Sequence, residues 1–268
     1  MGLTINTNLE AMDASRNLNK TESMISQSMQ RLSSGLRINS AADDVAGYAI
    51  SQSLQSQVNG LNQAAQNSQD AVALTQTAQG ALNDVNQMLQ RVRELGVEFA
   101  NGTTSEEDKE AIEGEVEQLV SEIERVGEHT EFNGVNLLNS TEEIKFQIGA
   151  NDEETIGITA IELFSEIEGD IEPSGLGEAE SLKKIDEAIA TTSHLAGEFG
   201  AVQDRIQFTQ TNLEVYSQNL AAAVSAITDV NMATEMTAFT KDEVLQQAGV
   251  SILAHANQLP DAALKLLE

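Results

Sequence analysis

Residues 54–92 read LQSQVNGLNQAAQNSQDAVALTQTAQGALNDVNQMLQRV, and the architecture of the chain follows from this stretch. Apolar or small residues recur along it at steps of three and four, which is close to a heptad repeat. These positions are Leu54, Val58, Leu61, Ala64, Ser68, Ala71, Thr75, Ala78, Leu82, Val85, Leu89 and Val92. No proline interrupts the pattern, so it predicts one helix from about residue 42 to residue 99, roughly 80 Å long.

A second stripe of the same kind runs through residues 185–230. Its members are Ile185, Ile189, Thr192, Leu195, Phe199, Val202, Ile206, Thr209, Leu213, Tyr216, Leu220, Ala223, Ile227 and Val230. The stripe predicts a second long helix that begins near Ala179. Two long helices separated by a compact middle can fold back antiparallel, which would bring both chain ends together.

Each end of the chain carries a shorter amphipathic segment, at residues 1–32 and at about 232–256. The first should stop at Ser33-Ser34-Gly35 and the second at Leu259-Pro260. The residues expected to serve packing or assembly are Leu18, Ile25, Leu32, Leu82, Val85, Leu89, Leu245 and Leu253. Two interpretations stay open, an intramolecular bundle and burial between subunits. An isolated pair of thin helices is marginal in water, so we favour burial of the termini between subunits.

The middle of the chain changes character after a break at residues 101–104. Ser105, followed by three acidic residues, should start another helix, and Gly127 and Asn133-Gly134 should end it. Apolar residues alternate in two short runs, which predicts a β-hairpin near residues 144–161. Glu162 to Gly177 is acidic, contains Pro173 and reads as a loop.

The predicted fold class is therefore mainly α, a long antiparallel helical bundle or coiled coil built from both chain ends, with a small β-hairpin region in the middle. We expect residues 1–41 and 231–268 to form one discontinuous coiled-coil domain. Residues 42–230 should form a second helical domain that includes the hairpin.

Charge narrows the range of partners. The formal net charge is −29, and residues 101–180 alone contribute −20 from 23 acidic and 3 basic residues. Such a surface repels nucleic acid and anionic membranes, so neither is an expected partner. No run approaches the roughly 20 apolar residues of a membrane span. Residues 1–6 lack the basic start and apolar run of a cleaved secretory signal.

Motifs for catalysis or cofactor binding are missing from the sequence. The three histidines, His129, His194 and His255, have no metal-ligand spacing, and the chain contains no cysteine. There is no phosphate-binding loop and no nucleophile motif. We therefore expect neither an enzyme nor a cofactor. Asn101-Gly102-Thr103 and Asn139-Ser140-Thr141 match the N-glycosylation acceptor pattern, which short stretches often meet by chance.

Several longer motifs follow one another along the chain. They are Ile5-Asn6-Thr7-Asn8, Arg16-Asn17-Leu18, residues 29–47 (MQRLSSGLRINSAADDVAG), residues 89–95 (LQRVREL), Ala100-Asn101-Gly102-Thr103, Phe132-Asn133-Gly134, Phe146-Gln147-Ile148-Gly149-Ala150-Asn151, Leu245-Gln246-Gln247-Ala248-Gly249 and Ala256-Asn257-Gln258-Leu259-Pro260. In this order they resemble the motifs of bacterial flagellins. The resemblance covers nearly the whole chain. The end of the chain departs from it, because the family usually closes near Leu-Leu-Arg and this chain reads Leu266-Leu267-Glu268.

The resemblance implies a structural subunit that polymerises with copies of itself into the extracellular flagellar filament used for motility. In such proteins both terminal helices pair in an inner layer, and the remaining helices form a second layer around it. The resemblance thus implies that residues 1–41 and 231–268 form the inner domain and residues 42–230 the outer helical domain. Because the second long helix follows the hairpin closely, no further outer domain is expected. The implied route is export through the flagellar type III machinery without a cleaved signal peptide. The implied partners are that machinery, a flagellin chaperone, the filament cap and the hook-junction proteins.

The resemblance also implies recognition by the host flagellin-sensing Toll-like receptor. The matching residues are Leu89, Gln90, Arg91, Val92, Arg93, Glu94, Leu95 and Glu115. The alternative is that these residues serve packing between subunits. Gly96 and Gly114 depart from the family's usual residues, and each glycine weakens a helix interior by roughly 0.5–1 kcal/mol. Competing functions for the chain are a hook–filament junction protein and, from another class, a secreted helical binding protein or adhesin.

Overall fold

The computed structural model describes residues 7–167 and 180–265 and divides the chain into two compact units. One unit comprises Met1–Ser56 with Leu220–Glu268, and the other comprises Gln57–Asn219. The predicted division of the chain at residues 41 and 231 into layers of a filament stays a prediction. The predicted boundaries lie in the two connections between helices. The boundaries of the compact units, after Ser56 and after Asn219, lie within the long helices instead.

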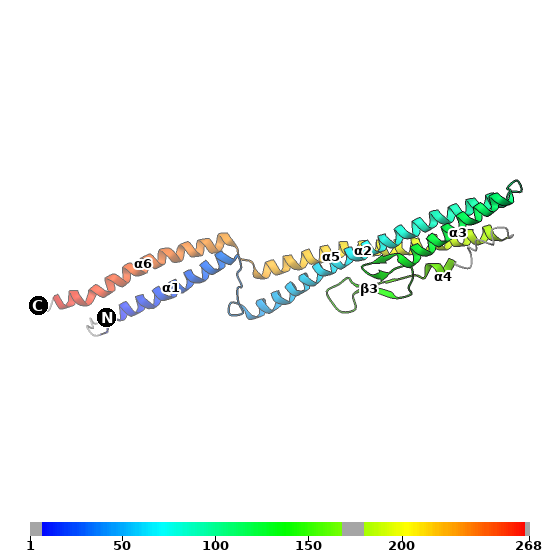
Figure 1. Ribbon diagram of the computed structural model, residues 1–268. Helices are drawn as coiled ribbons and strands as arrows, with labels where there is room; N and C mark the ends of the chain where they lie inside the picture. The colour runs from blue at the N-terminus through cyan, green and yellow to red at the C-terminus, as the bar shows by residue number, and fades with distance from the viewer. Residues whose placement is uncertain (1–6, 168–179, 266–268) are drawn as a thin grey trace. The chain divides into compact units, whose positions relative to one another are not determined.

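The unit that contains the chain ends is built on α1 (Leu9–Ser34) and α6 (Met232–Lys265), which run side by side (Figure 1). Asn8 Nδ2 donates to the carbonyl of Ala256 at 2.7 Å, and near the other end of α1 Ser28 contacts Glu235. Successive contacts therefore move forward along α1 and backward along α6. The predicted antiparallel pairing of the two ends is confirmed.

The ends of α1 follow its sequence closely. The Asn8 side chain accepts a hydrogen bond from the backbone N–H of Ala11, which caps the start of the helix. Gly35 ends it in the left-handed conformation with φ 73°, and its N–H donates to the carbonyl of Arg31. The predicted interruption at Ser33-Ser34-Gly35 is where the helix ends.

The chain between α1 and α2 (Val45–Phe99) is paired with the chain that links α5 (Ser181–Thr228) to α6. The N–H of Arg37 donates to the carbonyl of Thr228 at 2.6 Å, and the N–H of Val230 donates to the carbonyl of Gly35 at 3.0 Å. Ile38 is buried beside this bridge. Asp44 accepts from the N–H of Gly47 and so caps the start of α2.

In the other unit, α2 and α5 run antiparallel in a constant register. Ser217 Oγ donates to Asn62 Oδ1 at 2.9 Å, and Asn86 Nδ2 donates to Ser193 Oγ at 3.0 Å. A step of 24 residues forward along α2 is thus a step of 24 residues back along α5. Two matching heptad stripes predict such a constant register along the pair.

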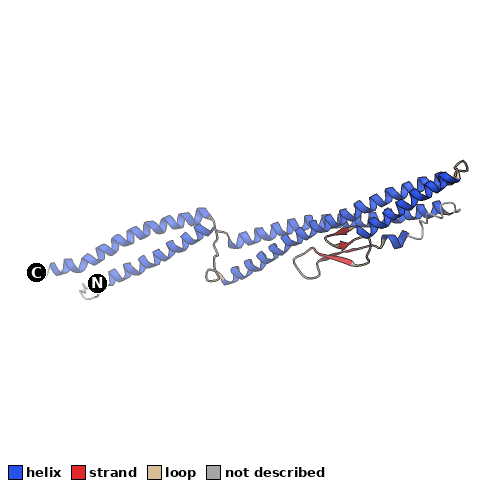
Figure 2. Cartoon of the chain, viewed as in Figure 1, coloured by secondary structure: helices blue, strands red, loops and turns tan. Residues whose placement is uncertain are grey.

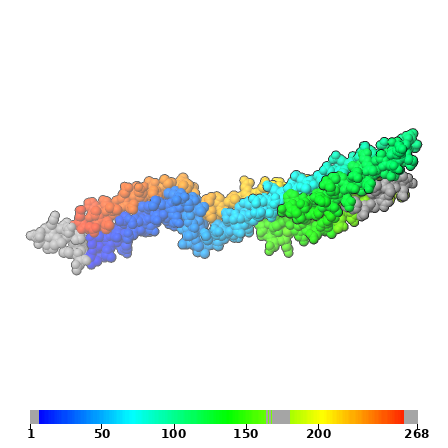
Figure 3. Space-filling view, viewed as in Figure 1, coloured from blue at the N-terminus to red at the C-terminus, as the bar shows by residue number. Residues whose placement is uncertain are grey.

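The apolar stripe on α2 forms one side of the core. All its predicted members except Leu54 are buried, and Leu82, Val85 and Leu89 are 0% exposed. Helix α3 (Glu106–His129) adds Ile112, Val116 and Ile123, and α5 adds residues such as Phe199 and Ile206. In the space-filling view the surface of α3 lies directly against that of α2 (Figure 3). On α5 the stripe is less complete, because Tyr216 is 51% exposed.

Two small antiparallel sheets lie beside these helices (Figure 2). Strands β3 (Glu143–Gln147) and β4 (Thr155–Thr159) form the predicted hairpin, with Ile156 and Ile158 buried. Strands β1 (Glu131–Phe132) and β2 (Val135–Asn136) were not predicted from the sequence. Their two-residue turn is Asn133-Gly134, with φ 52° and 79°, and Asn-Gly is the preferred pair for that turn type.

Two further predictions were wrong. Residues 163–167, assigned to a loop, form α4 (Leu163–Ile167), because Leu163 and Ile167 lie one turn apart and both enter the core. The rest of the predicted acidic loop, residues 168–177, lies outside the described residues. Helix α6 does not end at Leu259-Pro260 but continues to Lys265. Proline removes one backbone donor, and here the helix continues past it.

Candidate assembly surface

The interface between α1 and α6 is narrow and holds few large side chains. Leu18, Ile25 and Leu32 of α1 are only half-buried. The side of α6 that faces α1 has a glycine at this contact. A Cβ placed on Gly249 would meet Leu18 Cδ1 at 3.5 Å. Leu18 therefore packs against backbone, and the pair gains little burial per turn compared with the core around α2.

Polar contacts hold α1 and α6 together in an interface where apolar contacts are scarce. Ser28, 6% exposed, donates through Oγ to Glu235 Oε1 at 2.7 Å, and Arg31 approaches the same carboxylate oxygen at 3.8 Å. Asp242 of α6 is also buried, at 4% exposed. Glu235 and Asp242 were not predicted as contact residues from the sequence. Their position on the side of α6 that faces α1 was the available signal, because an acidic residue in the apolar stripe of a helix usually has a specific partner.

The outward faces of α1 and α6 expose most of their large apolar side chains. Of seventeen exposed large hydrophobic residues among the described parts of the chain, ten lie on these two helices. They are Leu9, Met12, Met24, Met29, Met232, Met236, Val244, Leu245, Val250 and Ile252. Their exposed fractions run from 43% for Met24 to 63% for Leu9. An apolar surface of this density is typical of a face that is covered by another protein.

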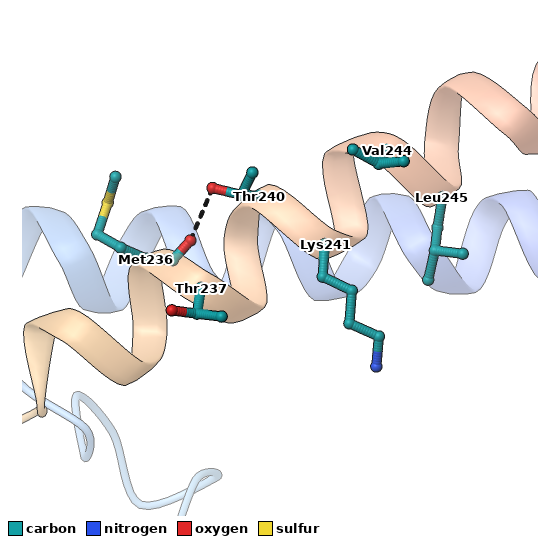
Figure 4. Close-up of a pocket in the computed structure, with 6 residues that line it drawn as sticks. All are labelled: Met236, Thr237, Thr240, Lys241, Val244 and Leu245. Carbon is teal, nitrogen blue, oxygen red and sulfur yellow. Dashed lines mark hydrogen bonds between the residues drawn. The ribbon is translucent and has the colours of Figure 1, made fainter.

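Part of this face forms a shallow groove on α6 (Figure 4). Its lining residues are Met236, Thr237, Thr240, Lys241, Val244 and Leu245. Thr240 Oγ1 donates to the carbonyl of Met236 at 2.9 Å, so its hydroxyl is used within the helix and its methyl group remains for contact. The groove therefore offers an apolar surface with one cationic side chain at its edge.

The predicted packing residues fall into two groups. Leu82, Val85 and Leu89 meet in the core formed by α2, α3 and α5. Leu18, Ile25, Leu32 and Leu253 are half-buried on α1 and α6, and Leu245 is 48% exposed. Leu245 therefore contributes little to packing within the chain. Its role in assembly stays a prediction.

The segment LQRVREL at residues 89–95 is divided between core and surface. Leu89, Val92 and Leu95 are buried, whereas Gln90, Arg91, Arg93 and Glu94 are exposed. Arg91 forms ion pairs with Glu115 of α3 at 2.9 Å and with Glu94 at 3.3 Å. The hydrogen bond to Glu115, and to a lesser extent the one to Glu94, raises the pKa of the Arg91 guanidinium. Arg93 instead pairs with Asp186 of α5 at 2.6 Å. The charged residues among those predicted to meet the receptor therefore form two separate ion-paired groups over a buried apolar row.

Two exposed carboxylates stabilise turns. Asp43 Oδ2 accepts from the N–H groups of Asn39 and Ser40, and these bonds lower the pKa of Asp43. Hydrogen bonds from Asn151 and Ala150 lower the pKa of Glu154 in the loop between β3 and β4. Both pKa shifts come from hydrogen bonds to neighbouring residues of the same turn. The two carboxylates therefore serve to hold the backbone of these turns.

Within residues 7–167 and 180–265, no group of three or more His, Cys, Asp or Glu side chains is arranged to hold a metal ion. None of the helices in that part of the chain has the length and apolar content needed to cross a membrane.

Comparison with known proteins places this arrangement in a family. The pattern of the bacterial flagellin N-terminal helical region matches residues 5–143, and that of the C-terminal helical region matches residues 182–267. A flagellin of Halalkalibacterium halodurans is 43% identical, over 99% of this chain and 100% of the relative. The flagellar filament 33 kDa core protein of Treponema phagedenis is 40% identical over the same shares.

Solved structures agree with the sequence comparison. The crystal structure of Bacillus cereus flagellin matches 59% of this chain and 94% of its own, with a TM-score of 0.51 and 28% identity. A putative flagellar hook-associated protein from Vibrio parahaemolyticus has a TM-score of 0.60 over 70% of this chain and 100% of its own, at 13% identity, which shows a shared fold. With relatives of 40% identity or more along its whole length, this chain belongs to the bacterial flagellins, the non-enzymatic structural subunits of the flagellar filament, an extracellular appendage.

Proposed function

We propose that the helix pair α1 and α6 carries the contacts that polymerise this chain into the motile filament. The supporting observation is the set of ten exposed large apolar residues on these two helices. Fully burying one such side chain is worth about 1.5–3 kcal/mol. Partial burial of several, repeated for every subunit, is enough to offset the entropy lost on association.

In this proposal the terminal segments, residues 1–41 and 231–268, form the inner layer of the filament. Residues 42–230 form the layer around it, with no further outer domain. Support for the last point comes from the short distance in sequence between α4, which ends at Ile167, and α5, which begins at Ser181.

The proposal extends to the partners that precede assembly. A chain with this much exposed apolar surface at its ends needs protection before it polymerises, which favours a dedicated flagellin chaperone. Export through the type III machinery without a cleaved signal, followed by contact with the hook-junction and cap proteins, is proposed from the family resemblance. Recognition by the flagellin-sensing Toll-like receptor is proposed for residues 89–95 with Glu115, because Arg91, Glu94 and Glu115 form one exposed ion-paired group.

The test is polymerisation of variants that change only the exposed apolar face. Replacing Val244 and Leu245 together by serine removes two side chains that are 60% and 48% exposed. The proposal expects a large rise in the critical concentration for filament formation, seen by sedimentation and negative-stain microscopy.

Val97→Ser is the matched control, because Val97 is 50% exposed on α2 in the other unit. It should polymerise as the unmodified chain does. Deletion of residues 1–40 or 232–268 should abolish filaments while the helical signal of the other unit persists. Filaments of normal length from either deletion would contradict the proposal.

A further inference from the structure

Half of the large apolar side chains exposed on α1 and α6 are thioethers. Five of the ten exposed large hydrophobic residues on these helices are methionines, with exposed fractions from 43% to 56%. They are Met12, Met24, Met29, Met232 and Met236. Of the described methionines only Met88 lies elsewhere, on α2, where it is half-buried against the core. The exposed thioethers of the described chain are therefore concentrated on the surface that is proposed to carry assembly.

Methionine is the only sulfur-containing residue type in the sequence. The chain has seven methionines, no cysteine and no tryptophan. Cysteine thiolates are the side chains that peroxides otherwise oxidise readily, and here none competes with the thioethers. A peroxide that reaches this chain therefore reacts mainly at its exposed methionines.

Three of these methionines lie together beside the contact between Ser28 and Glu235. Met29 and Met236 each follow directly after one residue of that facing pair. In an antiparallel pair of right-handed helices, residues at the same offset from a facing pair project to the same side. Met232 precedes Met236 by one helical turn and so shares its side of α6. We call Met29, Met232 and Met236 the methionine group.

The other two exposed methionines lie apart from this group. By the same geometry Met24, four residues before Ser28, projects to the other side of the helix pair. Met12 lies about four turns away from Ser28 along α1. The chain therefore contains exposed methionines inside and outside the group, which can be compared in one experiment.

We propose that oxidation of the methionine group by hydrogen peroxide prevents polymerisation of the unassembled chain. At each residue the thioether sulfur gives an electron pair to one peroxide oxygen. The O–O bond breaks, an S=O bond forms, and the second oxygen leaves as water with both protons. The sulfur loses two electrons and the peroxide gains them. The proposal rests on the proposed function, since it regulates the contacts of α1 and α6.

A sulfoxide opposes assembly because it is polar. Met236 lines the apolar groove on α6 (Figure 4), so its oxidation places a polar oxygen in that groove. Covering this oxygen with a neighbouring copy costs free energy unless a donor meets it, and methionine oxidation disrupts Met-rich interfaces for this reason. The change is reversible, because methionine sulfoxide reductases regenerate the thioether. Their thiol reductant is oxidised to a disulfide, and the sulfoxide oxygen leaves as water.

The first test treats the unassembled chain with hydrogen peroxide, removes the reagent and measures polymerisation by sedimentation. Mass spectrometry of proteolytic peptides records the sulfoxide at each methionine. The critical concentration should rise about tenfold or more once the methionine group is oxidised, a shift of about 1.4 kcal/mol. The grouped side chains are exposed, so helical circular dichroism of the unassembled chain should not change. Normal polymerisation of a chain in which all three are oxidised would overturn the proposal.

A leucine variant of the methionine group locates the effect. It carries Met29→Leu, Met232→Leu and Met236→Leu, which keep the apolar volume and remove the sulfur. Its critical concentration should stay within about twofold of the unmodified chain, both before and after peroxide. If peroxide blocks this variant as it blocks the unmodified chain, the assignment to the methionine group is wrong.

The matched control removes the same number of methionines and leaves the group intact. It carries Met12→Leu, Met24→Leu and Met88→Leu, and peroxide should block its polymerisation as in the unmodified chain. Val244→Ser with Leu245→Ser, assayed without peroxide, tests the proposed function separately. If that pair has no effect while the two leucine variants still differ after peroxide, the role of α1 and α6 fails and the methionine assignment stands.

The second test needs no substitution. The peroxide-treated chain is incubated with methionine sulfoxide reductases and dithiothreitol, and the loss of each sulfoxide is followed by mass spectrometry. The critical concentration should return to within about twofold of its original value as the methionine group is reduced. A chain whose three grouped thioethers are restored but which still fails to polymerise would overturn the proposal.

Discussion

Ser28 on α1 donates a hydrogen bond of 2.7 Å to Glu235 on α6, although the two residues are 207 positions apart in the chain. Their side chains are among the few that join the two chain ends through a specific polar contact. In an interface with little apolar burial, one such contact has a disproportionate effect on register, because alternative registers leave the carboxylate without its donor.

Ser28→Ala tests this contact. Removing the hydroxyl leaves the Glu235 carboxylate, 13% exposed, with Arg31 at 3.8 Å as its remaining partner across the interface. The expected cost is about 1.5–3 kcal/mol, the range for hydrogen bonds to charged groups, measured as a rise in critical concentration. Ser26→Ala, at an exposed position of α1, is the control and should have little effect. Equal behaviour of the two variants would show that the contact does not matter.

Leu82→Ala and Leu89→Ala test the stripe on which the fold was predicted. Both side chains are 0% exposed in the core of α2, α3 and α5. Each substitution should lower the free energy of unfolding by about 2–5 kcal/mol, measured by denaturant titration of the unassembled chain. Gln90→Ala, next to Leu89 but exposed, should change it by less than about 0.5 kcal/mol. A loss below that value at Leu82 or Leu89 would mean that the core is assigned incorrectly.

Glu115→Ala separates packing from receptor recognition. Arg91 and Glu115 are about half exposed, at 49% and 46%, so their ion pair should contribute less than about 1 kcal/mol to stability. The unfolding midpoint should therefore barely move. If the charged group over residues 89–95 is a recognition surface, activation of the receptor by the unassembled chain should fall markedly. Unchanged activation would assign these residues to packing alone.

Salt should promote assembly. Residues 101–180 carry −20 of the net charge, and neighbouring subunits bring such surfaces closer. Exposed charges are screened beyond about 10 Å at 0.1 M salt and about 3 Å at 1 M. The critical concentration should fall as sodium chloride rises from low to near-molar, as followed by sedimentation. A flat or rising curve would show that the acidic surfaces do not face their neighbours in the filament.

The long helices were predictable because their sequences leave few alternatives. An unbroken heptad-like stripe from Val58 to Val92 became a continuous buried row, and the matching stripe on α5 pairs with it in one register. Turn chemistry was equally informative where it was noticed: Ser105 caps α3 as expected, in a capping box with Asp108.

Short elements were missed because tertiary contacts decide them. Leu163 and Ile167 form a helical turn only because both side chains enter a core supplied by residues far away in sequence. Asn133-Gly134 was interpreted as the end of a helix, although it also specifies the tight turn between β1 and β2. The polar contact of Ser28 with Glu235 depends on the register of two distant helices, which neither helix specifies alone.

A helical reconstruction of the assembled filament would test the role of α1 and α6 most directly. In the unassembled chain Leu245, Val244 and Met236 are 48%, 60% and 49% exposed. If these helices carry the polymerisation contacts, all three side chains should be buried against neighbouring copies, with the terminal pairs gathered around the filament axis. Side chains at these positions that remain as exposed in the filament as in the single chain would contradict that role.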